Sequence, residues 1–484
     1  MLAAKQMAFI ILVNITLASC TVGPNFHHPK STEKRYVDVT LPGKTVHSAG
    51  QGGKAQTFAM GKEIPAKWWE LFHSPALNQL IILGFANSPT VAAAQAALCQ
   101  AQENLTAQIG TTLFPTINAQ GSGSRERFSP ETFGAPNASS TTFNLFNTQL
   151  NISYALDLFG GGRRQIEATS ALVNYQQYLL EGTYLTLAAN IVTTAITEAS
   201  LREQIQATQD LIRLEEDLLK IIKQQYTLGA IAKSDVLSQE SQVAQIRATL
   251  PPLDKSLALT RHTLSLLIGA MPTENVLPKF FLNQLHLPGE LPLSLPSKLI
   301  EQRPDVRANE ALLHQASANI GVATANLLPQ FNLTGYYGWD ANQLGSLFSD
   351  KTSIWNLTGQ VLQPIFQGGA LLAKRRAAIA AYQQAAAQYR QTVLQAFQNV
   401  ADTLRAIEID SRTLKAETEA LVAAKDLLTL TEAQFKLGAV TYLSLLNAQS
   451  QYQQALINRI KAEASRYTDT AALFQALGGG WWHE

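Results

Sequence analysis

Cysteine is scarce in this 484-residue chain, and its scarcity argues against a disulfide framework. Only Cys20 and Cys99 occur, and a lipid-modified Cys20 would leave Cys99 without an intrachain partner. An excess of either charge is also missing, since 37 Lys and Arg stand against 36 Asp and Glu. We therefore expect no nucleic acid among the partners of this protein.

Long hydrophobic runs are missing as well. After residue 20 the sequence contains no uninterrupted run of 18 apolar residues, which predicts that no helix crosses an inner membrane. A chain without such a helix can still cross an outer membrane as a β-barrel, because a closed barrel satisfies its own backbone hydrogen bonds.

Residue patterns that carry catalytic chemistry are not found. The eight histidines are scattered except for adjacent His27 and His28, and no HExxH, GxSxG or P-loop spacing occurs. The segment GGGRRQ lacks the spacing of a phosphate-binding loop and is better explained as a junction between a strand and a helix. The sequence predicts no enzyme, no metal site and no cofactor.

The first 20 residues predict a secreted, lipid-modified protein. Lys5 precedes an apolar stretch from Met7 to Ala18, which is shorter than the roughly 20 residues of a membrane-spanning helix and is typical of a signal peptide. The stretch ends in Leu-Ala-Ser-Cys, which resembles the lipobox of bacterial lipoproteins, with Cys20 as the acylated residue. An ordinary signal peptide with an incidental cysteine is the alternative. Acyl chains on Cys20 would hold the N-terminus in a membrane.

Beyond a polar segment that predicts an extended tether, the chain repeats itself once. Four short motifs recur in the same order about 210 residues later, a spacing far longer than the periods of solenoid repeats. The matches include the turns at Gly229 and Gly438 and the helix starts at Pro89 and Pro304. The predicted division is a signal peptide (1–19), a tether (20–62), a first repeat (63–270), a linker (271–298), a second repeat (299–477) and a tail (478–484).

Both repeats have the same predicted order of helix, two strands, long helix and return helix. The long helices are expected to reach about 65 residues, or roughly 100 Å at 1.5 Å per residue, whereas globular proteins average about three turns. Pro251 and Pro252 predict an interruption of the first return helix. The expected strands are 115–128, 143–159, 329–340 and 353–366, and the expected helices after the first are 163–227, 231–269, 304–328, 370–436 and 441–477.

The long helices alone would equally fit a spacer of antiparallel coiled coil, but the strands favour a membrane. Leu150, Ile152 and Tyr154 alternate with Asn151 and Ser153, as in a tilted transmembrane strand; a strand of a soluble sandwich can show the same pattern. Four strands cannot close a barrel, and eight leave an interior that side chains just fill. Three chains would supply twelve strands and a polar lumen, which predicts a trimeric duct continued by a helical tube.

Three stretches of this chain resemble a known family: CTVGPNFHHP after the leader, the central LIEQRPDVRANEALLHQASANIGVATANLLPQF, and the two LGA turns. Together they are similar to the outer membrane factors, the TolC-like efflux proteins, in their lipoprotein (NodT-type) branch. The resemblance covers essentially the whole mature chain. It implies an α+β membrane protein, a homotrimer whose 12-stranded outer-membrane β-barrel is continued by a periplasmic α-helical barrel with a mixed equatorial region.

The resemblance also implies a function. Such proteins conduct substrates passively to the outside and dock onto a periplasmic adaptor and an inner-membrane pump, here expected to be of the RND type. Cys20 would tether the tube to the outer membrane lipid. An outer-membrane component of type I protein secretion and a non-conducting envelope spacer are the alternatives, and the sequence does not name the substrate.

The resemblance places a periplasmic aperture beside the turns at Gly229 and Gly438. Asp235 follows the first turn, where family members often carry a lumen-facing aspartate. Three such carboxylates around one axis would repel one another and attract cations. The alternative is that Asp235 caps its helix together with Ser234.

The second turn departs from the family pattern. Many relatives have Arg-Tyr before this turn and Asp after it, where this chain has Gln434, Phe435 and Asn447. Without a hydroxyl on Phe435 and a charge on Asn447, the family's ionic contacts are not expected here. Leu443 is expected to supply an apolar constriction beside neutral hydrogen bonds.

The two strand-to-helix junctions carry cations near helix N-termini, where positive charge opposes the helix dipole. One hypothesis is that these side chains meet lipid phosphates; the alternative is a solvated surface. The five residues are Arg163, Arg164, Lys374, Arg375 and Arg376.

Overall fold

The structure is a computed structural model that describes residues 21–29, 36, 42–130, 134, 139–274 and 276–483. The leader and Cys20 lie outside the described residues. The chain divides into two compact units: unit 1 comprises residues up to Pro29, Ala97–Gln176 and Ala308–Tyr389, and unit 2 comprises Lys30–Ala96, Gln177–Arg307 and Arg390–Glu484. Each unit therefore takes residues from both sequence repeats.

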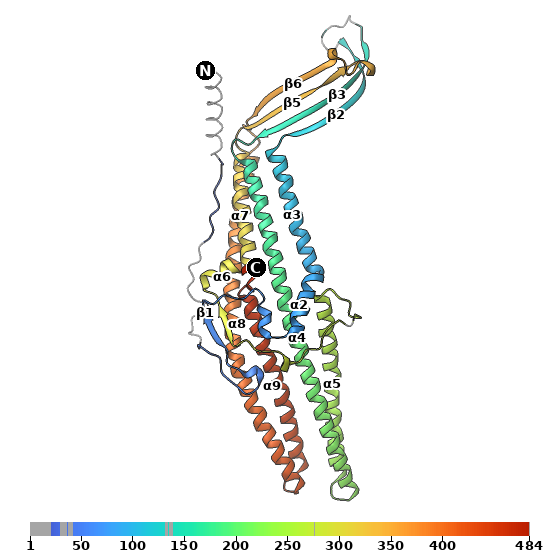
Figure 1. The fold of residues 1–484 in the computed structure, drawn as a ribbon, viewed down its shortest axis with the longest axis vertical. Helices are drawn as coiled ribbons and strands as arrows, with labels where there is room; N and C mark the ends of the chain where they lie inside the picture. Colours follow the sequence, from blue (N-terminus) through green and yellow to red (C-terminus); the bar gives the residue numbers. More distant parts are fainter. Residues whose placement is uncertain are drawn as a thin grey trace. The chain divides into compact units, whose positions relative to one another are not determined.

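Unit 1 contains a four-stranded antiparallel sheet in the order β2-β3-β5-β6 (Figure 1). Each repeat supplies one hairpin, and β3 pairs with β5 to join the two. The outer strands β2 and β6 each pair on one side only within the described chain. The strands are β2 Thr116–Phe128, β3 Thr141–Leu156, β5 Gln330–Ala341 and β6 Ser353–Leu362.

The strands and short helices end earlier than expected at three places. The expected strand 353–366 stops at Leu362 because Pro364 lacks a backbone N–H and Gly368 and Gly369 have positive φ. The expected strand 143–159 stops at Leu156, before a turn at Gly160 with φ 78°. The expected helix 304–328 stops at Ala325 and is followed by single turns with hydrogen bonds such as Leu328 N to Ala325 O at 3.0 Å.

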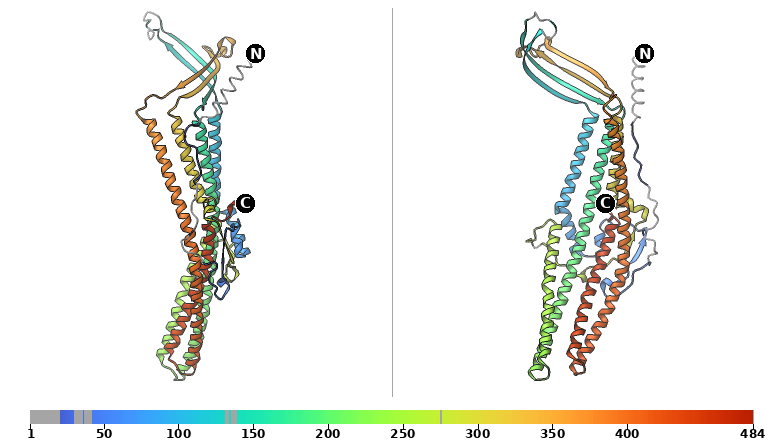
Figure 2. Two further views of the ribbon diagram at one scale, coloured as in Figure 1. Left: turned by 90° about the vertical axis from the view of Figure 1, so that its left-hand side faces the viewer. Right: turned by 180° about the vertical axis from the view of Figure 1, so that it is seen from behind.

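Four helices, α3, α4, α7 and α8, contribute residues to both units, and α5 and α9, of 35 residues each, lie in unit 2 and complete the hairpins. In unit 2, α4 pairs with α5 and α8 with α9, and each pair ends in a tight turn (Figure 2). The first return helix spans 233–267 rather than 231–269, since Gly269 with φ 70° ends it. The helices are α3 Pro89–Leu113, α4 Gly161–Thr227, α5 Lys233–Leu267, α7 Pro304–Ala325, α8 Ala370–Lys436 and α9 Tyr442–Ala476.

The prediction that Pro251 and Pro252 interrupt the first return helix is wrong, because α5 continues through both. A proline inside a helix removes one backbone hydrogen bond and crowds the preceding turn. Both prolines are exposed, so the carbonyls that lose their partners stay close to the surface, where water can satisfy them.

The core of unit 2 is built from small elements around α9. Trp68 and Phe72 are fully buried, and Trp68 stacks on Phe474 with ring centroids 5.4 Å apart. Strands β1 Thr57–Met60 and β4 Glu290–Leu293 pair in parallel. The remaining elements are α2 Pro75–Asn87, α6 Pro296–Gln302, and the 3₁₀ helices η1 Gln51–Gly53, η2 Trp68–Phe72, η4 Leu282–Gln284, η5 Leu344–Ser346, η6 Asp350–Thr352 and η7 Trp481–His483.

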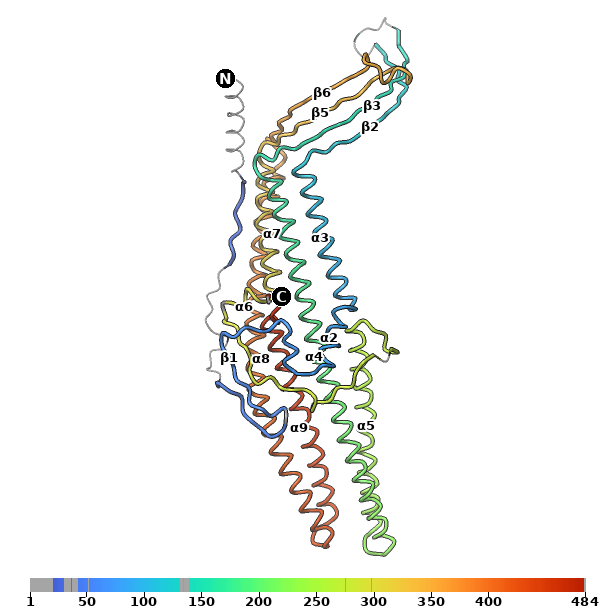
Figure 3. Tube along the Cα trace, in the orientation of Figure 1, coloured from blue at the N-terminus to red at the C-terminus, as the bar shows by residue number. Residues whose placement is uncertain are grey.

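The expected tether is, in its described C-terminal part, a packed segment. Residues 42–60 run beside α8 and α9 (Figure 3), and Thr45, Ser48 and Gln56 are buried. Gln56 donates through Nε2 to Pro288 O and Thr470 Oγ1, both at 3.1 Å. The polar composition of this segment supplies hydrogen bonds to the folded protein rather than flexibility.

Among the described residues, α4 is long and apolar enough by composition to cross a membrane, and 39% of its most apolar window is buried within the chain. Composition alone does not separate a membrane span from a core helix. Ile191, Val192 and Ile196 of α4 are fully buried, so this helix contributes to the core of unit 2.

Candidate functional site

One face of the sheet in unit 1 is apolar and exposed. The register aligns Leu150 with Tyr337 and Tyr337 with Trp355, and it aligns Ile152 with Gly335 and Gly335 with Leu357. Trp355 and Leu357 are 74% and 69% exposed. An exposed apolar face of this extent needs a partner that excludes water, and the alternation is that of a transmembrane barrel strand.

The opposite face of the same sheet is a ladder of polar side chains. Asn147 Nδ2 donates to Asp340 Oδ1 at 2.6 Å, and Gln149 Nε2 donates to Asn151 Oδ1 at 3.0 Å. Asn151 in turn donates to Gln120 Oε1 at 3.3 Å. A closed barrel with this face inward would have a polar lumen.

The chain just after Cys20 is held against α4. Val22 N donates to Phe159 O at 3.0 Å. The guanidinium of Arg164, which is 4% exposed, donates to Val22 O at 3.2 Å and Asn25 Oδ1 at 2.7 Å. Thr21 contacts Gly160, where a Cβ would come within 2.6 Å of its methyl group.

These contacts correct the lipid-phosphate hypothesis for two of its five cations. Arg164 also pairs with Glu167 at 2.7 Å, and Arg163 pairs with Asp157 at 3.3 Å. Protein groups therefore offset the positive charge at the start of α4. Lys374, Arg375 and Arg376 are exposed, although Arg375 Nε donates to Thr324 Oγ1 at 3.3 Å.

The two hairpin turns in unit 2 have the same backbone chemistry. Gly229 and Gly438 have φ of 74° and 75°, a conformation that costs other residues strain. At the first turn, Ala230 N donates to Gln225 O and Gly229 N to Tyr226 O, both at 2.9 Å. At the second, Ala439 N donates to Gln434 O and Gly438 N to Phe435 O, also at 2.9 Å. Both are Schellman caps, which use glycine to end a helix.

The hairpin tips, here meaning residues 215–240 and 428–446, share one apolar cluster. Ile222 of α4, Val236 of α5, and Tyr442 and Leu445 of α9 are buried in it. Phe435 of α8 packs against the cluster, with its ring centroid 5.8 Å from that of Tyr442. The cluster thus holds all four helices together at the tips.

A polar chain crosses this apolar cluster. Tyr442 donates its hydroxyl to Gln239 Oε1, and Gln239 Nε2 donates to Glu215 Oε2 at 2.7 Å and Glu215 O at 2.9 Å. Burial and, to a lesser degree, the charge of Glu432 raise the pKa of Glu215, although its bond with Gln239 opposes this. Burial, with the carboxylates of Glu215 and Asp235, raises the pKa of Tyr442 well above its usual range.

The predicted aperture residues differ in their burial and in the groups that they contact. Asp235 lies half-buried in the first turn of α5 and acts electrostatically on Tyr442. The cap of α5 is Ala232 with no side-chain hydrogen bond, so the capping alternative for Asp235 is not found. Leu443 is 65% exposed and Asn447 is exposed one turn later on the same face of α9.

Phe435 and Gln434 have packing and backbone roles within one chain. Phe435 is half-buried in the cluster, and the backbone carbonyl of Gln434 is part of the second turn. The sequence reading missed Glu215 and Gln239. The sequence pattern that could have identified them is a polar residue on the otherwise apolar face of each of two helices that are joined by a turn.

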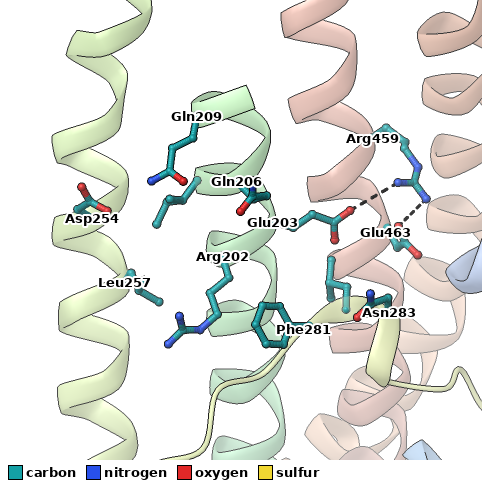
Figure 4. A pocket seen from close by; sticks show the side chains of 12 residues that line it. Arg202, Glu203, Gln206, Gln209, Asp254, Leu257, Phe281, Asn283, Arg459 and Glu463 are labelled. Carbon is teal, nitrogen blue, oxygen red and sulfur yellow. Dashed lines mark ion pairs between the residues drawn. The ribbon is translucent and has the colours of Figure 1, made fainter. Parts of the chain in front are cut away.

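A cleft of about 600 Å³ lies between α4, α5, α9 and the segment 281–283 of unit 2 (Figure 4). Arg459 bridges Glu203 at 3.8 Å and Glu463 at 2.7 Å across one wall. Burial and the neighbouring Glu463 raise the pKa of Glu203, while Arg459 opposes the rise. Arg202 on the other side is held by Glu198 at 2.6 Å, so the charges of this cleft are largely paired.

The described residues contain no cluster of three or more His, Cys, Asp or Glu side chains that could hold a metal ion. His28 instead contacts Glu310 at 2.5 Å, and His314 contacts Glu167 at 2.9 Å. Each of these histidines lies within hydrogen-bonding distance of one carboxylate.

Residues 82–270 and 295–479 match the model of the family described as outer membrane efflux protein. These two segments make up well over half of the chain and coincide closely with the two sequence repeats. The chain belongs to the outer membrane efflux protein family.

Relatives of this efflux protein match it over nearly their full lengths. The pyoverdine export outer membrane protein OpmQ of Pseudomonas putida is 29% identical over 89% of this chain and 92% of its own. The probable efflux pump outer membrane protein TtgC of Pseudomonas putida is 29% identical over 99% and 96%. The cation efflux system protein CusC of Escherichia coli is 26% identical over 97% of each.

Solved channels have the same fold. The outer-membrane channel OprN gives a TM-score of 0.87 over 96% of this chain at 24% identity. The open state of the MtrE channel of Neisseria gonorrhoeae gives 0.81 over 96% at 26% identity. The predicted fold class is thereby confirmed as that of the trimeric outer-membrane efflux channels. The protein is an outer-membrane exit duct of a tripartite efflux system.

Proposed function

We propose that this efflux protein is a lipid-anchored, passive conduit without enzymatic activity. It would work with a periplasmic adaptor and an inner-membrane pump of the RND type. The main support for a conduit is that the sheet has one apolar and one polar face. Trp355 and Leu357 lie on the apolar face, and Asn147 and Asn151 lie on the polar face. Similar proteins are named for the export of pyoverdine, toluene and cations. This diversity supports the view that the pump, and not the duct, selects the substrate.

Planar-bilayer recording tests the conduit directly. Purified trimers are expected to give discrete conductance steps, because a twelve-stranded barrel encloses water. Membrane insertion without any conductance, even in variants with loosened hairpin tips, would instead support a non-conducting spacer.

The proposed lipid anchor is Cys20. Its support is the lipobox-like sequence and the fixed position of the residues that follow, since Arg164 and Phe159 bind the chain from Val22 onward. Because the barrel already supplies a large apolar belt, the lipid would be an accessory to insertion. Cys20→Ala behind a conventional cleavable signal is expected to yield outer-membrane trimers, and recovery of this variant only as soluble periplasmic protein would contradict the accessory role.

The proposed gate is the ring that three copies of the hairpin tips would form. Asp235 would give it cation preference, and Leu443 with Asn447 would form a neutral constriction. The support is that Leu443 and Asn447 are exposed on one face of α9, while the opposite face is fixed in the apolar cluster by Tyr442 and Leu445. The side chains that face outward from such an anchored helix are free to line an aperture.

Conductance of Asp235→Ala and Leu443→Ala trimers across a salt series tests this gate. Asp235→Ala is expected to lose most of the cation preference, and Leu443→Ala is expected to raise the resting conductance. Asp217→Asn is the matched control, since Asp217 is an exposed carboxylate on α4 paired with Lys220. Unchanged selectivity in Asp235→Ala, or strong opening of the wild type by salt alone, would rule out this gate.

A further inference from the structure

The apolar face of the sheet in unit 1 ends in two arginines. Strands β2 and β3 pair in continuous antiparallel register over the whole length of β2. Side chains alternate between the two faces of a sheet, and directly opposed residues share a face. Arg125 and Arg127 therefore lie on the same face as Ile117, which is aligned with Ile152 of the apolar face. Both arginines are exposed, so one end of the apolar face is cationic.

Charge is divided between the two faces of this sheet. Within the four described strands the carboxylates are Glu126 and Asp340, and both lie on the polar face, where Glu126 accepts from Ser124 Oγ at 2.8 Å. The two arginines are the cations of these strands, and both lie on the apolar face. Neither guanidinium has a hydrogen bond or an ion pair with a described residue. The arginines are thus available to an anion outside this chain.

The arginines lie just beyond an apolar band of membrane thickness. The band runs along β3 from Leu156 to Phe146, which are about ten residue steps apart. At about 3.3 Å per residue and a strand tilt of roughly 40°, this length corresponds to a height of about 25 Å, as in the apolar belt of a transmembrane barrel. Arg125 is aligned with Asn144, the next residue of β3 on this face after Phe146. The guanidinium groups are therefore placed at the level of lipid headgroups.

Aromatic side chains mark the same boundary of the band. The ring centroids of Tyr337 and Trp339 are 5.4 Å apart, and Trp339 lies at the same distance from Phe348. Trp339 is aligned with Thr148, which precedes the level of the arginines by two residues of the same face of β3. Aromatic rings gather at the interface between membrane and water. The arginines follow this aromatic row on the side of water.

The cationic end of the sheet is its outer end. The opposite end of the hairpin is joined to α3 and α4 (Figure 1), and the helices of this fold form the periplasmic barrel. The arginines thus face the outer leaflet, whose lipid in an outer membrane is a phosphorylated glycolipid. Guanidinium groups bind phosphate oxygens through paired, charge-assisted hydrogen bonds.

We propose that Arg125 and Arg127 form a binding site for the phosphate groups of the outer-leaflet glycolipid. A bound phosphate offsets two positive charges that have no carboxylate on their own face of the sheet. A trimer would carry three such sites, one on each β2. The site is separate from the proposed gate and from conduction, because it lies on the face of the sheet opposite to the polar one.

The test is native mass spectrometry of full-length trimers in a neutral detergent, titrated with lipid A that carries both of its phosphates. The wild type is expected to bind up to three copies. The double substitution Arg125→Gln and Arg127→Gln should weaken binding roughly tenfold or more, because each lost cation reduces the attraction to an anionic headgroup. Equal binding by this variant and the wild type would overturn the proposal.

A charge-neutral exchange is the matched control. Ser124→Arg combined with Arg125→Ser keeps the composition of β2 and moves one guanidinium to the polar face. This variant should bind lipid A as weakly as Arg125→Gln alone, and wild-type affinity would contradict a site on the apolar face. If the variants do not assemble, the wild type decides the matter with dephosphorylated lipid A, which should bind roughly tenfold more weakly; equal binding of the two lipids would overturn the phosphate contact.

Two further probes distinguish the source of the phosphate. Inorganic phosphate at the concentration of lipid A should not displace the lipid, and displacement would show a site for free anions instead. Phosphatidylglycerol should bind more weakly than lipid A, because it offers one phosphate and one negative charge. Equally tight binding of phosphatidylglycerol that is lost in the double variant would overturn the assignment to the outer-leaflet glycolipid.

Discussion

The hairpins α4–α5 and α8–α9 come from the two sequence repeats. Their turns have the same geometry, but their helices have different surroundings. Both turns use a glycine with φ near 75° and the same pair of capping hydrogen bonds. Their return helices differ, because α9 buries one face almost along its length and holds residues 45–56 through Arg466, whereas α5 carries exposed Pro251 and Pro252. Local backbone chemistry was preserved between the repeats, while burial was set by what each helix packs against.

The largest expected effect separates α9 from α5. Arg466 is buried and its guanidinium donates to four acceptors in residues 45–56. Arg466→Ala would leave these acceptors without their donor and should lower the free energy of unfolding by about 3–5 kcal/mol. Arg247→Ala on α5 removes an exposed arginine that pairs with Glu216 and should change it by no more than about 0.5 kcal/mol. Urea titration followed by circular dichroism measures both, and similar losses would contradict the contrast between the return helices.

A smaller effect is expected where the two hairpins meet. Tyr442→Phe removes the hydroxyl that donates to buried Gln239, and should cost about 1–3 kcal/mol as well as raise the resting conductance. Phe435→Leu keeps an apolar group in the same cluster and serves as the comparison, with packing lost but no polar atom left unpaired. Equal conductance in Tyr442→Phe and wild type would show that the polar chain does not hold the tips closed.

The pH dependence of the tips should follow Glu215. Because burial raises its pKa, the protonated form is favoured in the folded tip, and this stabilisation is present at acid pH and lost as pH rises through the raised pKa. Glu215→Gln should flatten the pH profile of resting conductance, and an unchanged profile would assign the dependence to another group.

The smallest expected effect concerns the starts of the return helices. Thr441 caps α9 by accepting from Ser444 N at 3.4 Å, whereas Ala232 at the start of α5 offers no side-chain bond. Thr441→Ala should cost about 1 kcal/mol, and Ala232→Ser should gain about 0.5–1 kcal/mol. Hydrogen exchange of the first turn of each helix measures the change. Protection from exchange should fall in Thr441→Ala and rise in Ala232→Ser, and changes of the same sign would contradict the prediction.

Some misreadings of the sequence have a common physical cause. Polar residues 45–56 are part of the predicted extended tether, because composition does not reveal that Arg466, more than 400 residues away along the chain, supplies their hydrogen-bond partners. Pro251 and Pro252 predict a break in a helix that in fact continues. The rule that proline interrupts a helix takes no account of exposure, and both prolines are exposed. Arg163 and Arg164 were assigned to lipid or solvent, although Asp157 and Glu167 lie close to them in both sequence and space.

The sequence by itself determined the features that depend on near neighbours. Period-two alternation predicted the two-faced strands, and the glycine turns predicted where the long helices reverse, because both follow from the geometry of a few adjacent residues. The duplication and its motifs also predicted the family, which the match over 82–270 and 295–479 confirms. Only the tertiary structure decided which polar residues are buried together. Glu215, Gln239 and Tyr442 come from three helices, and Arg466 of α9 meets residues 45–56, which lie more than 400 residues away along the chain. Such clusters form when side chains that are far apart in the sequence are buried together away from water. A local sequence pattern does not show which of these side chains meet.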